Sequence, residues 1–352
     1  MKSSISDRIE KEIRRLLEEN TEVRKEELSD AFHASKPLVS YVFARLLKSG
    51  KILKVGSTRG AYYVLNTEKN RKSLEKKVTR LKKTYKNVDL EEHAIFEEFK
   101  AGMPRLNILH DNIQSIFFYA FTEMANNAIE HSQSERIDII VELVDNSLCF
   151  EVRDRGIGVF NNVRKKRKLK DGYEAAAELL KGKTTTAPDV HTGEGIFFTS
   201  KAADLFVLDS YGLTMKVDNA APDVFLYESK PLKGTNVRFE ISLNSDRHLA
   251  RDVFGPYTTN ADEPAFDKTK IRISLYKYGT AQMSRSQARR IVSGLEKFKT
   301  VVFDFENIPY VGQAFADEIF RVFARRHPKI GISYEHADKA VTFMIERVES
   351  EK

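Results

Sequence analysis

The feature that most constrains the fold is a helix-like stretch that carries polar residues at regular positions. Apolar residues recur in it at three- and four-residue steps, namely Leu109, Ile113, Ile116, Ala120 and Met124. This spacing predicts an amphipathic helix with one side packed on a core. The helix continues into EMANNAIEHS (residues 123–132), where Glu123, Asn127 and His131 follow at four-residue steps. Buried polar groups need partners, so these side chains either cap a neighbouring loop or face a binding site.

A strand that ends in an acid and two glycines follows this helix. In SLCFEVRDRGIGVF (residues 147–160), Asp154 closes the predicted strand, and Gly156 and Gly158 come next at alternate positions. This pattern places a hydrogen-bond acceptor beside an open backbone loop, which suits a flat ring that carries an amine. Cys149, the single cysteine, lies in the apolar alternation of the strand and is predicted to be a small buried hydrophobe.

Two more glycine-containing segments complete the set. In TGEGIFFTSKAADLF (residues 192–206), Gly193 and Gly195 begin an apolar-periodic helix, and amides at a helix N-terminus can bind an anion. In KGTNVRFEIS (residues 233–242), Thr235 leads into an alternating strand.

These four pieces, in this order over roughly residues 110–243, resemble the GHKL ATP-binding fold of gyrase, histidine kinases and mismatch-repair ATPases. The resemblance implies ATP and Mg²⁺ as cofactors. It implies Asn127 as the Mg²⁺ ligand and Asp154 as the acceptor of the adenine amine, with Thr235 near the adenine. It also implies that Gly156 and Gly158 let the chain pass close to the nucleotide, and that Gly193 and Gly195 hold the phosphates beneath a mobile lid. Lys183 and Thr184 to Thr186 would lie on that lid.

Glu123 decides the chemistry that the resemblance implies. Its position is usually an asparagine in histidine kinases and a glutamate in gyrase-type ATPases and anti-sigma serine kinases. A carboxylate one turn from the metal ligand can activate the hydroxyl of water or of a serine. His131 matches the serine-kinase branch, although a helix-end residue that caps carbonyls explains it as well. No phosphoacceptor histidine box of a conventional sensor kinase is evident.

The N-terminal segment is basic and resembles a winged helix-turn-helix domain. Residues 1–86 hold 22 Lys and Arg against 11 Asp and Glu, whereas the remainder holds 36 against 40. Three predicted helices and a hairpin fill residues 1–65, and the basic excess favours DNA as the partner. By the resemblance, the DNA contacts come from the third helix and the wing: Ser35, Lys36, Ser40, Tyr41, Arg45, Lys54, Thr58 and Arg59. The alternative is a winged helix that contacts protein alone.

The remaining segments are a linker and a C-terminal domain. Residues 66–87 are highly charged and predict a connecting helix, with a homodimer contact possible there. Residues 268–352 alternate strands and helices, and TVVFDFENIPYVGQAFADEIFRVF resembles a STAS-like domain that can bind a protein partner. The loop at 311–315 lacks the serine of the phosphoswitch members of that family.

The sequence thus predicts an α+β multidomain protein. Its domains are a winged helix (1–65), a helical linker (66–87), a GHKL α/β sandwich with helices on one face of a mixed sheet (88–250), and a small α/β STAS-like domain (268–352). With no apolar span long enough for a membrane, we expect a cytoplasmic protein.

Three functions stay open at this stage. The first is a transcriptional regulator in which Mg²⁺-ATP binding or hydrolysis switches DNA binding. The second is an anti-sigma-type serine/threonine kinase with a fused antagonist-like domain. The third is an interaction protein that binds ATP without hydrolysing it.

Overall fold

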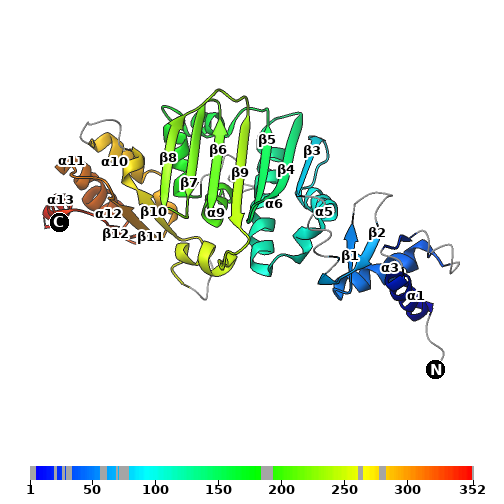
Figure 1. Cartoon of the computed structure of the whole chain (residues 1–352). Coiled ribbons are helices and arrows are strands. Elements are labelled where there is room, and N and C mark those ends of the chain that lie inside the picture. Colours follow the sequence, from blue (N-terminus) through cyan, green and yellow to red (C-terminus); the bar gives the residue numbers. More distant parts are fainter. Residues whose placement is uncertain are drawn as a thin grey trace.

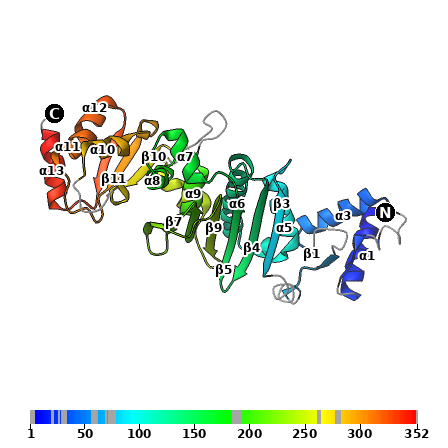
Figure 2. The same cartoon turned by 90° about the horizontal axis from the view of Figure 1, so that it is seen from above.

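A large sheet occupies the middle of the molecule, and smaller units extend from two opposite sides of it (Figure 1). A second view shows the same linear arrangement, with the N-terminal and C-terminal units at opposite ends (Figure 2). The computed structural model describes residues 5–19, 22–25, 28, 34–55, 62–68, 70, 79–183, 193–260, 265–276 and 283–350.

The central sheet has seven strands, and all neighbouring pairs run antiparallel. Its spatial order is β3-β4-β5-β9-β6-β7-β8. The strands are β3 (Arg80–Lys86), β4 (Arg136–Val144), β5 (Ser147–Asp154), β6 (Leu205–Ser210), β7 (Leu213–Asp218), β8 (Asp223–Glu228) and β9 (Thr235–Ser242). The prediction of a mixed sheet is wrong, because β9 inserts between β5 and β6. Strands β5 and β6 have the same direction, and the chain between them contains the helices of residues 159–202. They do not pair with each other.

Helices cover one face of this sheet (Figure 1). They are α5 (Glu92–Gly102), η1 (Pro104–Ile108), α6 (Asp111–His131), α7 (Val159–Arg167), α8 (Gly172–Lys181) and α9 (Gly195–Ala202). The predicted apolar side of α6 packs on the sheet, where Phe117 and Phe121 lie edge-on to Phe150 of β5. Phe150 in turn stacks on Phe239 of β9 with centroids 5.0 Å apart. This aromatic core fixes the position of α6 and hence of its polar side.

The charged segment before the sheet differs from its prediction. Residues 80–86, expected within a connecting helix, form strand β3 and pair with β4. The helical prediction is wrong there, and the sheet begins before residue 88. Alternate side chains of β3 turn toward α5, where Tyr85 Oη donates to Glu98 Oε2 at 2.7 Å and Lys83 pairs with the same carboxylate at 2.7 Å. These partners lie far along the chain, so the local helical spacing did not decide the structure.

The N-terminal unit has its own core. Its elements are α1 (Ile5–Glu19), α3 (Lys36–Lys48), β1 (Ile52–Val55) and β2 (Tyr62–Leu65). Ser35 caps α3 by accepting a hydrogen bond from the Leu38 amide at 3.4 Å. Strands β1 and β2 pair antiparallel, and Val23 forms a bridge to Tyr63. The predicted first and third helices and hairpin strands are present. The second helix falls largely outside the described residues, and the winged-helix interpretation stays a prediction.

The C-terminal unit is a small α/β structure, as predicted, and its strands pair parallel. Its three strands are β10 (Lys268–Arg272), β11 (Thr300–Asp304) and β12 (Gly331–Glu335). The helical elements after β9 are η2 (Leu249–Phe254), η3 (Gly255–Tyr257), η4 (Ile273–Tyr276), α10 (Arg285–Val292), η5 (Leu295–Lys297), α11 (Gln313–Ala316), η6 (Asp317–Phe323), α12 (Ala324–Arg326) and α13 (Lys339–Ser350).

The central and C-terminal units share one continuous hydrophobic core, whereas the N-terminal unit has a separate one. Phe266, just before β10, stacks on Phe197 of α9 with centroids 4.9 Å apart. Lys181 at the end of α8 donates to the carbonyls of Arg290 and Ser293 at 2.9 and 3.1 Å. Helices α8 and α9 are therefore anchored on the C-terminal unit. Within the described ranges, no helix combines the length and apolar character that crossing a membrane requires.

Candidate functional site

A cavity of about 310 Å³ lies between the polar side of α6, the ends of β5 and β9, and the start of α9. This volume is in the range of small-molecule sites. Glu123, Asn127 and His131 all line it, so the three side chains at four-residue steps share one wall. Other predicted residues line the same cavity: Asp154, Gly158, Gly193, Gly195 and Thr235. The sequence therefore located most of a binding site that the fold assembles from four separate segments.

Asp154 is buried at the end of β5, with 4% of its surface exposed. Its Oδ1 accepts hydrogen bonds from the backbone N–H groups of Gly156 at 2.8 Å and Thr235 at 3.2 Å. Burial raises the pKa of the Asp154 carboxyl, while those two N–H groups oppose the rise. The Asp154 carboxylate also lines the cavity, where it can accept a hydrogen bond from a ligand.

The loop after Asp154 needs glycine. Gly158 has φ +76° and begins α7, and a Cβ there would lie 2.5 Å from Ser210 Oγ. Gly156 is held by Asp154 through its N–H, and its carbonyl accepts from Tyr211 Oη at 2.8 Å. The loop is thereby fixed in an open path along the cavity.

Thr235 fastens this loop to β9. Its Oγ1 accepts from the Val159 N–H at 3.1 Å, and its own N–H is bonded to Asp154. A threonine at this position therefore joins the two strands that form the floor of the cavity.

The start of α9 lies directly against Glu123. A Cβ on Gly195 would be 2.1 Å from Glu123 Oε2, so a glycine is required for this approach. Gly193 and Glu194 also line the cavity just before the helix begins. The backbone amides at this end of α9 are thus next to the Glu123 carboxylate, as expected for a site that binds phosphates.

Asn127 has a feature that points to a ligand. Its Nδ2 atom is buried and has no hydrogen-bond partner within the described residues. A buried amide without partners is costly, and the cost is removed when a ligand or its hydration shell enters the cavity. An amide oxygen beside the Glu123 carboxylate is a donor set that suits a hard cation such as Mg²⁺.

Lys183 is not placed at the cavity. Its Nζ lies over the rings of Phe266 and Phe298, 5.5 and 5.1 Å from their centroids, and donates to the Lys297 carbonyl at 3.4 Å. Burial lowers the pKa of this lysine, while the charges of Glu194 and Asp267 oppose the shift. The structure therefore turns Lys183 toward the C-terminal unit. The lid threonines 184–186 lie outside the described residues.

One further residue that lines the site was missed, Glu194, together with Tyr119, which lies close enough to feel the charges of Glu123 and Glu194. Glu194 stands between the two glycines and lines the cavity. Tyr119 lies one turn before Glu123, and burial raises its pKa, followed by the charges of Glu123 and Glu194. The signals for them were present in the sequence. Glu194 lies within a Gly-x-Gly pair, and Tyr119 continues the four-residue series of Glu123 and Asn127.

The predicted DNA contacts on α3 have mixed environments. Lys36 is exposed at the helix start, and Tyr41 has 61% of its surface exposed. Ser40 accepts from Lys25 Nζ at 3.3 Å, and Lys54 on β1 is partly exposed.

Arg45 points instead to α1, where it pairs with Glu10 and lies 3.7 Å from Asp7. The Arg45 guanidinium therefore forms ion pairs within the N-terminal unit. Arg59 and Thr58 lie outside the described residues.

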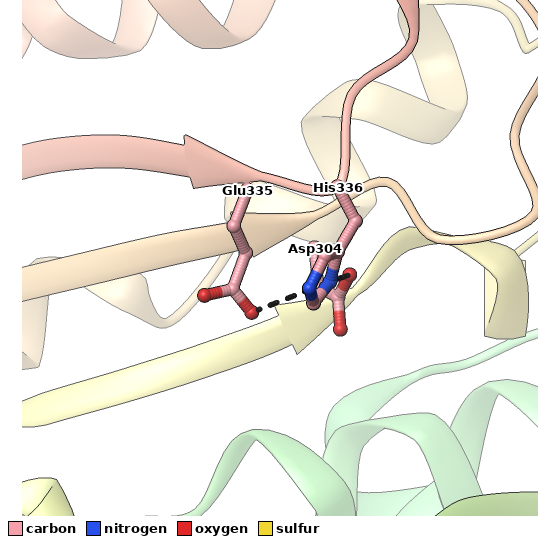
Figure 3. Close-up of side chains that lie close together, drawn as sticks. All are labelled: Asp304, Glu335 and His336. Atoms are coloured by element: carbon pink, nitrogen blue, oxygen red, sulfur yellow. Dashed lines mark hydrogen bonds and ion pairs between the residues drawn. The ribbon is translucent and has the colours of Figure 1, made fainter.

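A second polar cluster lies at the carboxyl ends of β11 and β12 (Figure 3). It consists of Asp304, Glu335 and His336, whose possible ligand atoms lie within 4.8 Å of one another. His336 Nδ1 is 2.9 Å from Asp304 Oδ1, as the close-up shows. However, Lys270 Nζ pairs with both Glu335 and Asp304 Oδ2, at 3.1 Å from the latter. The Lys270 ammonium occupies the position that a metal ion would take. We therefore interpret these three side chains as an ion-pair cluster around Lys270.

Comparison with known families agrees with this geometry. Residues 113–245 match the family model described as histidine kinase-, DNA gyrase B-, and HSP90-like ATPase. This part of the chain is a GHKL-type ATPase domain. The predicted GHKL resemblance is confirmed, and the domain supports ATP binding, which in this family typically includes Mg²⁺.

A second family model covers the C-terminal unit. Residues 287–342 match a STAS-like domain of unknown function (DUF4325), which confirms the STAS-like resemblance and suggests a protein-interaction module. A search of curated proteins gave no match to the chain. Neither family model extends over the N-terminal unit, so DNA binding there stays a prediction.

Proposed function

We propose that the protein is an ATP-dependent regulator in which the GHKL-type domain binds and hydrolyses Mg²⁺-ATP and thereby switches the units at its two ends. The observation that carries this proposal is the shared cavity of Glu123, Asn127 and Asp154. These residues supply a carboxylate, a metal-binding amide and an adenine acceptor in one enclosed space.

Each residue then has a separate role in binding. The Asp154 carboxylate accepts from the adenine amine, and Thr235 and Gly158 hold the loop against the ring. Asn127 would hold Mg²⁺, which neutralises phosphate charge. The amides at the start of α9 donate to the phosphates, and the unpartnered amide of Asn127 gains a partner when the site fills.

Hydrolysis depends on Glu123. Its carboxylate lies beside the start of α9, where the terminal phosphate would sit, and it accepts a proton from the attacking water. Burial, followed by the charges of Glu123 and Glu194, raises the pKa of Tyr119, so its phenol stays neutral beside this carboxylate.

The packing of α8 and α9 indicates how a change at the nucleotide site would reach the neighbouring units. Helices α8 and α9 come before and after residues 184–192 in the sequence and are both anchored on the STAS-like unit through Lys181 and Phe197. A shift of α9 on ATP binding or hydrolysis is therefore transmitted to that unit. The basic N-terminal unit is the proposed DNA-binding end, with Lys36 and Tyr41 as exposed contacts, and Ser40 and Lys54 beside them.

A serine/threonine kinase of the anti-sigma type is the second candidate. His131 lines the cavity one turn beyond Asn127. This arrangement resembles that of the serine-kinase branch. In that case Glu123 activates a hydroxyl of a protein partner instead of water.

One experiment separates these functions. The full chain is incubated with Mg²⁺ and γ-labelled ATP, and free phosphate and protein-bound label are both counted. Slow phosphate release that Glu123→Gln abolishes supports the ATPase switch. Acid-stable label on protein, also abolished by Glu123→Gln, supports the kinase. Glu130→Gln is the matched control, since Glu130 is an exposed carboxylate on the same helix.

A hydrolysis rate that Glu123→Gln leaves unchanged contradicts both enzymatic proposals. Tight ATP binding with neither phosphate release nor protein-bound label would favour instead an interaction protein that uses ATP to hold its shape. The DNA part of the proposal is tested separately, by mobility shift with random-sequence duplex DNA in the presence and absence of a non-hydrolysable ATP analogue. DNA affinity that does not respond to nucleotide contradicts the switch.

A further inference from the structure

A second cavity, of about 190 Å³, lies at the junction between the GHKL-type domain and the STAS-like unit. The domain side contributes α8, α9, β7 and β8, and the STAS-like side contributes β10 and the end of β11. The charged and polar side chains that line it are Lys181, Lys201, Lys270, Arg272, Asn219, Tyr257, Asp223 and Asp304. It is separate from the nucleotide cavity, with which it shares no lining residue.

Most of the charges in this junction cavity have partners. Lys181 pairs with Glu178 and donates to two carbonyls. Lys270 is held by Asp304 and Glu335, in the cluster of Figure 3. Arg272 pairs with Asp223 at 2.8 Å. These contacts fix the two cations of β10 in place on one wall.

Lys201 differs from the other cations. It extends from α9 into the cavity, and within the described residues its ammonium has no carboxylate or carbonyl partner. The Lys201 Nζ atom instead lies over the face of the Phe197 ring, 5.6 Å from the ring centroid, in a cation–π contact. Burial, followed by the charges of Arg272 and Lys270, lowers the pKa of Lys201 to about 8. A desolvated cation beside two like charges is unfavourable until an anion joins it.

We propose that the junction cavity binds a small phosphate-like dianion between Lys201 of α9 and the cations Lys270 and Arg272 of β10. Tyr257 is the neutral hydrogen-bonding group on the wall that can donate to the anion, whereas the Asn219 amide already donates to the Ser200 and Ala203 carbonyls. The anion supplies the negative charge that Lys201 lacks and joins the GHKL-type domain to the STAS-like unit. The inference does not depend on ATP hydrolysis, because it uses none of the residues of the nucleotide cavity.

The position of Lys201 gives the bound anion a regulatory consequence. Gly195 at the start of α9 lines the nucleotide cavity, and Lys201, close to the end of the same helix, lines the junction cavity. The two positions are six residues apart, so they are separated by roughly 9 Å along the helix axis. An anion that fixes the end of α9 against β10 therefore stabilises the start of α9 beside Glu123.

The test is a calorimetric titration of the full chain with inorganic phosphate at constant ionic strength, with sodium chloride as the reference. We expect one saturable site. Lys201→Met should weaken phosphate binding roughly 10- to 100-fold, because it removes a charge-assisted hydrogen bond. Lys268→Met is the matched control, since Lys268 lies on β10 with Lys270 and Arg272 but does not line the cavity.

A saturating non-hydrolysable ATP analogue identifies the competing site. Phosphate binding that the analogue abolishes and that Lys201→Met retains belongs to the nucleotide cavity and overturns the proposal. Binding that is the same in Lys201→Met and wild type also overturns it, as does the absence of saturable binding in wild type. Arg272→Gln is measured in parallel, and its expected loss of affinity keeps the test valid if Lys201→Met fails to fold.

The pH dependence provides a second readout. The groups that face Lys201 across the cavity are Lys270 and Arg272 on β10, Asp304 on β11, Lys181 on α8, Asp223 on β8 and Tyr257 on η3. Lys201 itself loses its proton near pH 8. Because the second ionisation of phosphate is nearly complete by pH 8, the phosphate affinity of the wild type should fall as the pH rises from 8 to 10. In Lys201→Met this fall should be absent, and a parallel fall in the variant contradicts the assignment.

Discussion

Asp154→Asn tests the proposed adenine pocket most directly. In the wild type, Oδ1 of Asp154 accepts from the N–H groups of Gly156 and Thr235. An asparagine keeps that acceptor and places an NH₂ group where, by our proposal, the carboxylate accepts from the adenine amine. A donor then faces a donor. Loss of a charge-assisted hydrogen bond of about 1.5–3 kcal/mol weakens ATP binding roughly 10- to 100-fold.

The same substitution should leave the free protein folded. Because burial raises the pKa of Asp154, ionisation of this carboxyl opposes folding at neutral pH. The neutral asparagine removes that cost and keeps both backbone contacts. The free energy of unfolding of Asp154→Asn should therefore match the wild type at low pH, where both side chains are neutral. It should equal or exceed the wild type as the pH rises through the raised pKa.

Two measurements check this reasoning. Calorimetric titration with Mg²⁺-ATP gives the affinity, and urea unfolding at several pH values gives the stability. Asp145→Asn is the control, because Asp145 is an exposed carboxylate in the β4–β5 turn, away from the cavity, with φ +51° that asparagine also tolerates. Unchanged ATP affinity in Asp154→Asn refutes the pocket assignment, and a wild type that gains stability over the variant with rising pH refutes the burial argument.

Three further predictions concern other parts of the chain. Gly195→Ala should lower the rate of ATP hydrolysis at least roughly tenfold with little change in ATP affinity, because the new Cβ displaces Glu123; an unchanged rate in a phosphate-release assay contradicts this. Lys181→Met should lower the free energy of unfolding by about 3 kcal/mol, since it breaks the buried pair with Glu178. Urea unfolding measures this loss, and a further Glu178→Leu substitution should recover part of it. Burial raises the pKa of the Cys149 thiol to about 12, so labelling by a thiol reagent at pH 8 should be roughly a thousandfold slower than in urea. Equal rates would contradict the buried environment.

The sequence by itself determined the local parts of the nucleotide site. The spacing along residues 109–131 requires a helix that packs on one side, and Glu123 and Asn127 then share the other side whatever surrounds them. Asp154 at a strand end and the glycines after it are likewise properties of a short segment. For this reason these residues could be assigned before the fold was known, and the cavity brings them together.

The tertiary structure decided every feature that depends on a partner far along the chain. Residues 80–86 became a strand because β4 offered an edge, and the sheet became antiparallel because β9 inserted between β5 and β6. Lys183 and Arg45 were assigned by position to a ligand and to DNA, but they turned to Phe298 and Glu10. The junction cavity around Lys201 joins two domains, and no local pattern encodes such a site. Side-chain charge and spacing are written in the sequence, whereas burial and partners arise only when distant segments pack.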